Sequence, residues 1–350
     1  MSKSPLTWLK SVLSRGKPFI RWFVLGAIVF FLAQTVKDRA AEVASLQISR
    51  SGWLKLAIAL CVTALAHIWS GWVWLWILRQ FDPPPGSFRD RHVPLGRGLY
   101  IYLTTNVAKY LPGNVWHFYG RIKAIAESGT PFSVAALSVL LEPLLMAAAA
   151  LAIAIFGSLN LATGDLSPTS PAFFDPLRFL KLLALFAVLV GVHPRLLNPV
   201  IQFLGKLKLK RQPPRSSSVS EATPEGLPVT DVPTEPIAAQ LTRYPLSPFL
   251  GEIGFLLLRG SGFILTVDVM TSVQWSAIPT LMSGFSVAWL LGLVVPGAPG
   301  GIGIFEATAI AILSHQFSPA AILGAVAFYR LISILAESAT AAIAWGLGKR

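Results

Sequence analysis

The sequence predicts an all-α integral membrane protein with about six full transmembrane helices, two re-entrant or broken helix pairs, and halves that could form an inverted repeat. Three observations predict this class. Hydrophobic residues make up 54% of the 350-residue chain and charged residues only 13%, with a mean hydropathy of +0.63. Apolar stretches of membrane-spanning length recur, and two are interrupted by Pro-Gly pairs. Because soluble domains carry about 25% charged residues, we expect this chain to lie in a bilayer.

The net charge of +13 has two interpretations. A basic chain can bind nucleic acid, but no basic stripe interleaved with exposed aromatic residues occurs here. In membrane proteins, Lys and Arg gather in cytoplasmic loops and beside anionic headgroups, and this interpretation is favoured. The single cysteine, Cys61, excludes an intrachain disulfide and a cysteine metal cluster. We therefore expect no nucleic-acid partner, no metal and no cofactor.

Hydropathy places the six full spans at approximate positions. The first follows a basic segment, as in a signal peptide, but no small-x-small cleavage site comes after it, so we expect a retained helix. The second carries several tryptophans, which favour membrane interfaces. The last is long enough to cross with tilt. The predicted spans are about 19–36, 53–78, 131–157, 177–193, 248–270 and 319–347.

Two further regions, 95–127 and 276–315, fit neither a span nor a loop. Each has two helix-compatible arms around a Pro-Gly break, and each arm is predicted to be short for a ~30 Å hydrocarbon core. Such a region forms a re-entrant hairpin or a discontinuous helix, with its break shielded by protein or by a watery cavity. The arms are 95–111 and 114–127 in the first region, and 276–295 and 301–315 in the second.

The second break contains the stretch VVPGAPGGIGIFE at 294–306, whose glycines match the G-x-x-x-G-x-G spacing of some dinucleotide-binding loops. That interpretation needs an α/β unit and usually an acidic residue about 20 positions on, whereas no Asp or Glu lies between Glu306 and Glu337. A broken membrane helix fits better, since proline removes backbone hydrogen bonds and glycine leaves the backbone bare. The predicted break residues are Pro112, Gly113, Pro296, Gly297, Pro299, Gly300, Gly301 and Gly303.

A linker divides the chain into two membrane halves, 1–204 and 248–350. Residues 205–247 are rich in Pro, Ser and Thr, which is typical of a disordered segment. With a cytoplasmic N-terminus and both broken regions re-entrant, 17 Lys and Arg residues lie on the cytoplasmic side and 3 on the other. This asymmetry predicts a cytoplasmic linker and cytoplasmic N- and C-termini, in a plasma (inner) membrane. If the broken regions cross fully instead, the protein has eight or more spans.

The two broken regions carry charges in the same order. The first break is followed by Arg121 and then by Glu142 in the next span, whereas the second is followed by Glu306 and then by Arg330, with the signs exchanged. This order favours an inverted-topology repeat, which many transporters use to build a site near the bilayer midplane. A chance similarity stays the alternative.

Ionisable residues at membrane depth are the strongest candidates for a site, because an unpaired charge there costs at least ~2.5 kcal/mol. We expect Arg121 to pair with Glu142, and Glu306 with Arg330. Arg330 and Glu337 are seven positions apart, so they share a helix face and can line one cavity without touching. The alternative is that such pairs only lock helices together. The candidate residues of a headgroup cavity are Glu306, Arg330, Glu337, Arg121, Glu142 and Arg259.

The stretch PGAPGGIGIFEA, followed by AFYRLIS, resembles the lysylphosphatidylglycerol synthase transmembrane family, a flippase-like module, and KYLPGNVWHFYGR resembles its first-half motif. The resemblance covers roughly 20–348. It implies the module associated with moving lipids between leaflets, without the aminoacyl-transferase domain of the best-known members, the multiple peptide resistance factors. The family pattern maps onto Pro296, Pro299, Gly300, Gly301, Gly303, Glu306, Tyr329 and Arg330.

Three functions stay open at this point. A lipid flippase or transporter that moves a polar or anionic lipid between leaflets is favoured, with membrane lipids as its partners. A membrane-embedded subunit of an enzyme for lipid- or polyprenyl-linked substrates is disfavoured, because neither H-E-x-x-H nor G-x-S-x-G occurs, and no catalytic residue is predicted. The third is a helical membrane scaffold.

Overall fold

The computed structural model describes residues 48–81, 93–111, 115–158, 176–196, 198–199, 241, 243–294 and 303–348. Within these residues the chain is helical, apart from turns and one isolated bridge between Phe81 and Leu241, which confirms the all-α class. The predicted span at 19–36 and most of the linker at 205–247 lie outside the described residues. So do all the predicted break residues except Gly303.

The first half places a short helix pair between two long helices. It begins with α2 (Arg50–Leu78), where the Ser49 hydroxyl accepts a hydrogen bond from the amide of Gly52 and so caps the helix. The short pair consists of α3 (Leu95–Asn106), prolonged by the 3-10 turn η1 (Val107–Tyr110), and α4 (Trp116–Ala126). The second long helix is α5 (Phe132–Ser158), which contains Pro143, and α6 (Pro176–Gly191) follows it.

The second half repeats this order. A long helix, α8 (Leu246–Met270), is followed by the short turn η3 (Trp275–Ala277) and α9 (Ile278–Val294). Next come the short α10 (Ile304–Leu313) and the long α11 (Pro319–Leu347), which begins with Ser318 as its N-cap and proline at its first position.

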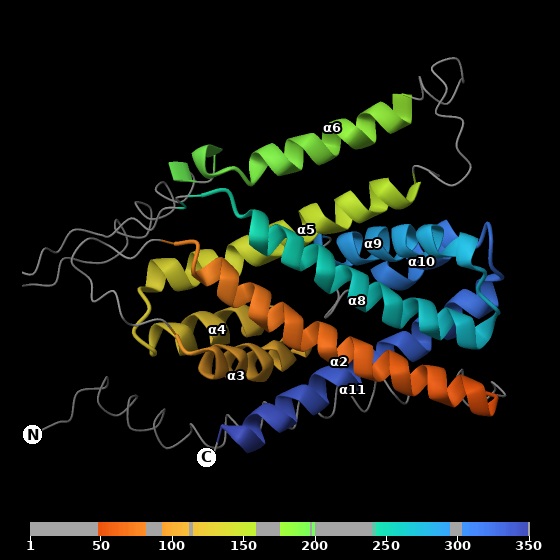
Figure 1. The fold of residues 1–350 in the computed structure, drawn as a ribbon, viewed down its shortest axis with the longest axis horizontal. Helices are drawn as coiled ribbons and strands as arrows, with labels where there is room; N and C mark the ends of the chain where they lie inside the picture. The colour runs from red at the N-terminus through yellow and green to blue at the C-terminus, as the bar shows by residue number, and fades with distance from the viewer. Residues whose placement is uncertain are drawn as a thin grey trace, which may run out of the picture.

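Five helical segments are long and apolar enough to cross a membrane: Arg50–Leu78, Phe132–Gly157, Leu246–Met270, Trp275–Val294 and Pro319–Leu347. Four of them confirm predicted spans. The fourth segment, Trp275–Val294, corrects the prediction that the arm at 276–295 is short, because its 20 residues reach about 30 Å at 1.5 Å per residue. α6 occupies the predicted span at 177–193 and has 16 residues; it lies at one edge of the molecule, against α5 (Figure 1).

Both broken regions fold back on themselves. In the first, Gly120 of α4 lies beside Thr105 of α3, and Arg121 reaches Asn106, so the two short helices run antiparallel on either side of the break. In the second, Gly284 of α9 lies against Leu313 at the far end of α10. Each pair therefore returns to the side from which it starts, which favours re-entrant hairpins over crossing helices.

The two halves correspond helix by helix, with opposite directions. α2 and α8 pack antiparallel along their lengths: Lys55 pairs with Asp268 near one end, and the Trp69 indole donates to the Gly251 carbonyl near the other. The short helix α3 packs on α2, α4 and α11, and its counterpart α9 packs on α8, α10 and α5. Exchanging the halves thus preserves the pattern of contacts, as an inverted repeat requires.

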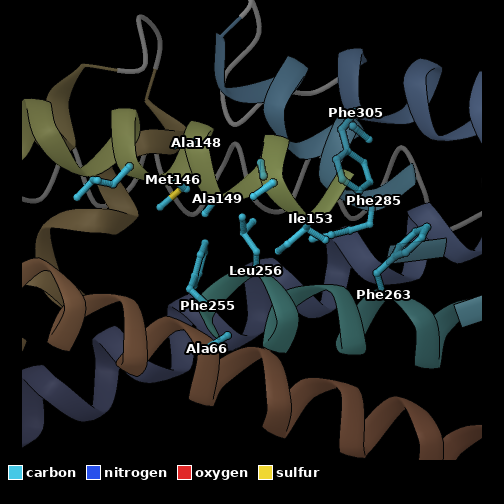
Figure 2. Packing of buried hydrophobic residues seen from close by; sticks show 14 of the residues in the cluster. Ala66, Met146, Ala148, Ala149, Ile153, Phe255, Leu256, Phe263, Phe285 and Phe305 are labelled. Carbon is cyan, nitrogen blue, oxygen red and sulfur yellow. The ribbon is translucent and has the colours of Figure 1, made fainter. Parts of the chain in front are cut away.

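The largest apolar core lies between α5, α8, α9 and α10 (Figure 2). Small residues on α5, such as Ala148 and Ala149, allow the neighbouring helices to approach closely, as is usual between membrane helices. Phe263, Phe285 and Phe305 pack edge-to-face or tilted, with ring centroids 5.6–6.0 Å apart. This core holds the second hairpin firmly against α8, beside the charged groups described next.

Candidate functional site

A cavity of about 370 Å³ lies between the two halves and is lined by residues from both. Its walls come from α2, α3, η1, α4 and α5 on one side, and from α8, α9, α10 and α11 on the other. Several lining residues sit near the middle of long apolar helices, among them His67 in α2, Arg259 in α8 and Glu337 in α11. Its ionisable lining residues are His67, Lys109, His117, Arg121, Glu142, Arg259, Arg330 and Glu337, with the phenols Tyr102 and Tyr329.

The first half contributes the ion pair between Arg121 of α4 and Glu142 of α5, which confirms the predicted pairing. Both side chains are almost fully buried. The Tyr102 hydroxyl donates to Glu142 Oε1 over 2.8 Å, and the Arg121 guanidinium lies 4.0 Å from the centroid of the Tyr102 ring. A buried charge needs this kind of paired and hydrogen-bonded environment, so α3, α4 and α5 are joined at this point.

The second half contributes the counterpart pair, Glu306 of α10 and Arg330 of α11, also as predicted. Arg330 Nε lies 3.0 Å from Glu306 Oε1, and the Gly303 amide donates to Glu306 Oε2 over 2.7 Å. Gly303 has φ +89°, a conformation that glycine adopts readily and other residues rarely do. The carboxylate thus closes the first turn of α10 while the arginine from the next helix balances its charge.

The third cluster joins the two halves at Glu337, and its pairing was not predicted. Lys109 of η1 lies 2.8 Å from this carboxylate, and the Tyr110 hydroxyl donates to Oε2 over 2.9 Å. Arg259 of α8 approaches from the other side, at 3.4 Å. In the sequence, Lys109 stands three residues before the Pro112-Gly113 break. Because a carboxylate at membrane depth needs a cation nearby, a cationic partner of Glu337 could be expected from the sequence. The sequence did not indicate that this partner is Lys109.

Glu252 of α8 was missed altogether, although it lies inside the predicted span 248–270. Its side chain is 0% exposed, and neither carboxylate oxygen has a hydrogen-bond partner among the described residues. The charged groups that act on it are Glu142 and Arg121. Applying the search for ionisable residues at membrane depth to every predicted span would have found it.

The predicted site residues therefore gather in one place. Arg121, Glu142, Arg259, Arg330 and Glu337 line the cavity, and Glu306 reaches it through Arg330. Asp268, near the C-terminal end of α8, pairs with Lys55 at 2.7 Å, away from the cavity. Within the described part of the chain, no three His, Cys, Asp or Glu side chains are grouped as a metal site.

The arrangement suits the binding of a polar or charged group in an apolar surrounding. Donors and acceptors converge from both halves, while the walls between them are aromatic and aliphatic, including Phe255, Trp289 and Phe305. Ligand sites of this kind are mostly apolar, with a few well-placed polar groups. The fold and the cavity define a class: a helical integral membrane protein with a charged central site between two corresponding halves.

The comparison with known families agrees with this class and narrows it. The family model described as the lysylphosphatidylglycerol synthase TM region matches residues 19–339, and the chain belongs to this family. A search of curated protein sequences found no match. Membership links the chain to lipid modification or transport in the membrane.

Proposed function

We propose that this protein is a lipid transporter of the flippase type, which carries a polar or anionic headgroup through the cavity between its halves while the acyl tails stay in the bilayer. The observation that supports it most is a charged cavity that both halves build near mid-depth of apolar helices. A charged headgroup crosses a hydrocarbon core at a high cost. Charged and polar side chains at the same depth lower that cost.

The inverted correspondence of the halves also supports transport. In transporters with inverted repeats, the site lies between the repeats near the midplane, and one repeat moves against the other. Here each half supplies a hairpin and an ion pair on its own side of the cavity, namely Arg121 with Glu142 and Glu306 with Arg330. The enzyme and scaffold hypotheses stay as alternatives that an experiment separates.

The test is lipid exchange between leaflets. The full chain is reconstituted into vesicles with fluorescent phospholipids, and the rate at which label crosses the bilayer is measured by quenching from outside. Glu306→Gln removes the charge that balances Arg330. We expect it to slow exchange by about tenfold or more, which corresponds to ~1.4 kcal/mol in the barrier.

The matched control is Glu127→Gln, since the Glu127 side chain is 67% exposed and lies 4.0 Å from Lys123. It should leave exchange unchanged. Thermal unfolding of both variants reports whether the fold persists. Equal exchange in vesicles with and without the protein, with lost stability only for Glu306→Gln, would support a scaffold. New lipid species on chromatography would support an enzyme.

A further inference from the structure

The cavity carries more positive than negative charge among its described residues. Its cations are Lys109, Arg121, Arg259 and Arg330, whereas the carboxylates that pair with them are Glu142, Glu306 and Glu337. Arg121 and Arg330 each have a carboxylate of their own. Glu337 is shared by two cations, so this cluster holds the excess positive charge.

Of the two cations that pair with Glu337, Arg259 makes the weaker ion pair. Lys109 lies 2.8 Å from both Glu337 oxygens, whereas the Arg259 contact is 3.4 Å through one nitrogen. The carboxylate also accepts a hydrogen bond from Tyr110. With its charge satisfied on the Lys109 side, Glu337 compensates Arg259 only in part. Arg259 is nevertheless 3% exposed, and a buried guanidinium is costly unless it is paired and hydrogen-bonded.

Donors without acceptors surround Arg259. The guanidinium lies over the ring of Trp289, at 5.0 Å, and near that of Tyr329, at 5.6 Å. Arg259 Nε, Trp289 Nε1 and the Tyr329 hydroxyl all lack a hydrogen-bond partner among the described residues. Ser333, one turn along α11 from Tyr329, donates its proton to the Tyr329 carbonyl, and its oxygen lies near the Tyr329 hydroxyl without the geometry of a hydrogen bond. All four residues line the cavity.

We infer that Arg259, Tyr329 and Trp289 form the subsite for a phosphate group, separate from the two neutral ion pairs of the cavity. This inference rests on the proposed function and names the chemical class of its substrate, a phosphate-bearing lipid. Phosphate offers several acceptor oxygens and negative charge, and guanidinium is the side-chain group that matches its geometry best. Such a group would satisfy the orphaned donors and balance the excess charge. The subsite adjoins Glu337, which lies between it and Lys109.

The test compares three probes on the purified full chain in detergent micelles. Dioctanoyl phosphatidylglycerol has tails and a phosphate, dioctanoylglycerol has the same tails without phosphate, and sodium phosphate has no tails. Dissociation constants are measured by microscale thermophoresis. We expect the phospholipid to bind at least about tenfold more tightly than either of the other probes.

Tyr329→Phe is the cleaner variant, because it removes only a hydroxyl that lies near Ser333 without a hydrogen bond of normal geometry, so it should leave the fold intact. We expect it to weaken phosphatidylglycerol binding by about tenfold, because the complex loses one hydrogen bond to a charged group. Binding of dioctanoylglycerol should not change. Its matched control is Tyr119→Phe, at a phenol that is 61% exposed, which should alter neither constant.

Arg259→Gln is the second variant. Glu337 keeps Lys109 and Tyr110 in this variant, so its charge stays compensated. We expect at least about tenfold weaker phosphatidylglycerol binding, with no change for dioctanoylglycerol.

The outcomes separate this inference from the proposed function. Equal affinity for the two lipids, or variants that bind phosphatidylglycerol like the parent protein, overturns the phosphate subsite while leaving lipid transport intact. Tight binding of sodium phosphate, lost in both variants, supports the anion subsite but assigns it to a free anion. Absence of binding for all three probes overturns the subsite, and leaflet exchange then decides independently whether the protein transports lipids.

Discussion

Buried charges in this protein are paired almost one by one. Arg121, Glu142, Arg259, Glu306 and Glu337 each have an ion-pair partner. In the described part of the chain, Glu252 is the one buried Asp, Glu, Lys or Arg with neither an ion pair nor a hydrogen bond. An isolated carboxylate in an apolar interior is so costly that the group keeps its proton. Glu252 is therefore expected to be a neutral acid in the folded protein.

This expectation leads to a stability prediction. Glu252→Gln replaces one neutral side chain with another of similar shape, so the thermal midpoint in detergent should change by no more than a few degrees. Glu142→Gln is the comparison, because it leaves Arg121 without its charged partner, and breaking a buried pair costs about 3–5 kcal/mol. Equal destabilisation by both substitutions would show that Glu252 is ionised.

The sequence could predict two of the three charged clusters, and the reason is local. Arg121 and Glu142, or Glu306 and Arg330, lie on neighbouring helices of one half, so the order of elements brings them together. Lys109 and Glu337 are 228 positions apart, and their contact depends on how the halves pack. No pattern within either half contains that information, so the bridge between the halves was beyond sequence reasoning.

At the scale of the elements, α2 and α8 approach each other closely at glycines of α8, and Gly262 is one of them. A Cβ added at Gly262 would lie 2.6 Å from the Thr63 hydroxyl and 3.5 Å from the Ala59 carbonyl. Small residues permit such close packing of membrane helices, where van der Waals contact replaces the hydrophobic effect as the driving force.

Gly262→Leu should therefore push α2 and α8 apart. Because overpacking of this kind costs about 1–3 kcal/mol or more, we expect the variant to be less stable. The loss is measured as a lower thermal midpoint. The matched control is Gly346→Leu in α11, where a Cβ would meet nothing within 4 Å. If the two leucine variants have the same thermal midpoint, α2 and α8 are not closely packed at Gly262.

Hydropathy and breaker residues predicted most of the elements, because long apolar runs and Pro-Gly pairs are local signals. The error concerned the arm at 276–295, which was predicted to be short although η3 and α9 form a segment of 20 residues. Whether such a segment crosses or returns is decided by its partner, and α10 packs back along it from Leu313 toward the break. That antiparallel contact is tertiary and leaves no periodic signal.

At the scale of the whole molecule, the opposed directions of the halves place equivalent turns at opposite ends. The turn between α4 and α5 follows Ala126, and its counterpart between α10 and α11 follows Leu313. Figure 1 shows these turns at opposite ends of the helix bundle. Glu127 and Gln316 are exposed residues within them.

We predict that cysteines at these two positions lie on opposite sides of the membrane. Glu127→Cys and Gln316→Cys are introduced separately into a Cys61→Ala background, since Cys61 is the single native thiol. A membrane-impermeant maleimide is then applied to intact cells and to inverted vesicles. From the positive-inside asymmetry, position 127 should label only in inverted vesicles and position 316 only in intact cells.

Permeabilised membranes serve as the control, because both cysteines should label there. Labelling of both positions from the same side would contradict an inverted arrangement. It would also require that one of the broken regions crosses the membrane fully.

The close contact of Gly262 with Thr63 has a consequence for motion. It lies where the two antiparallel long helices approach each other, about one turn along α8 from Arg259. If the halves rotate against each other, the helices are displaced least along this contact between α2 and α8. Their displacement grows with distance from the contact. The carboxylate of Glu337, held by cations from both halves, would then be the group whose neighbours exchange as access passes from one leaflet to the other.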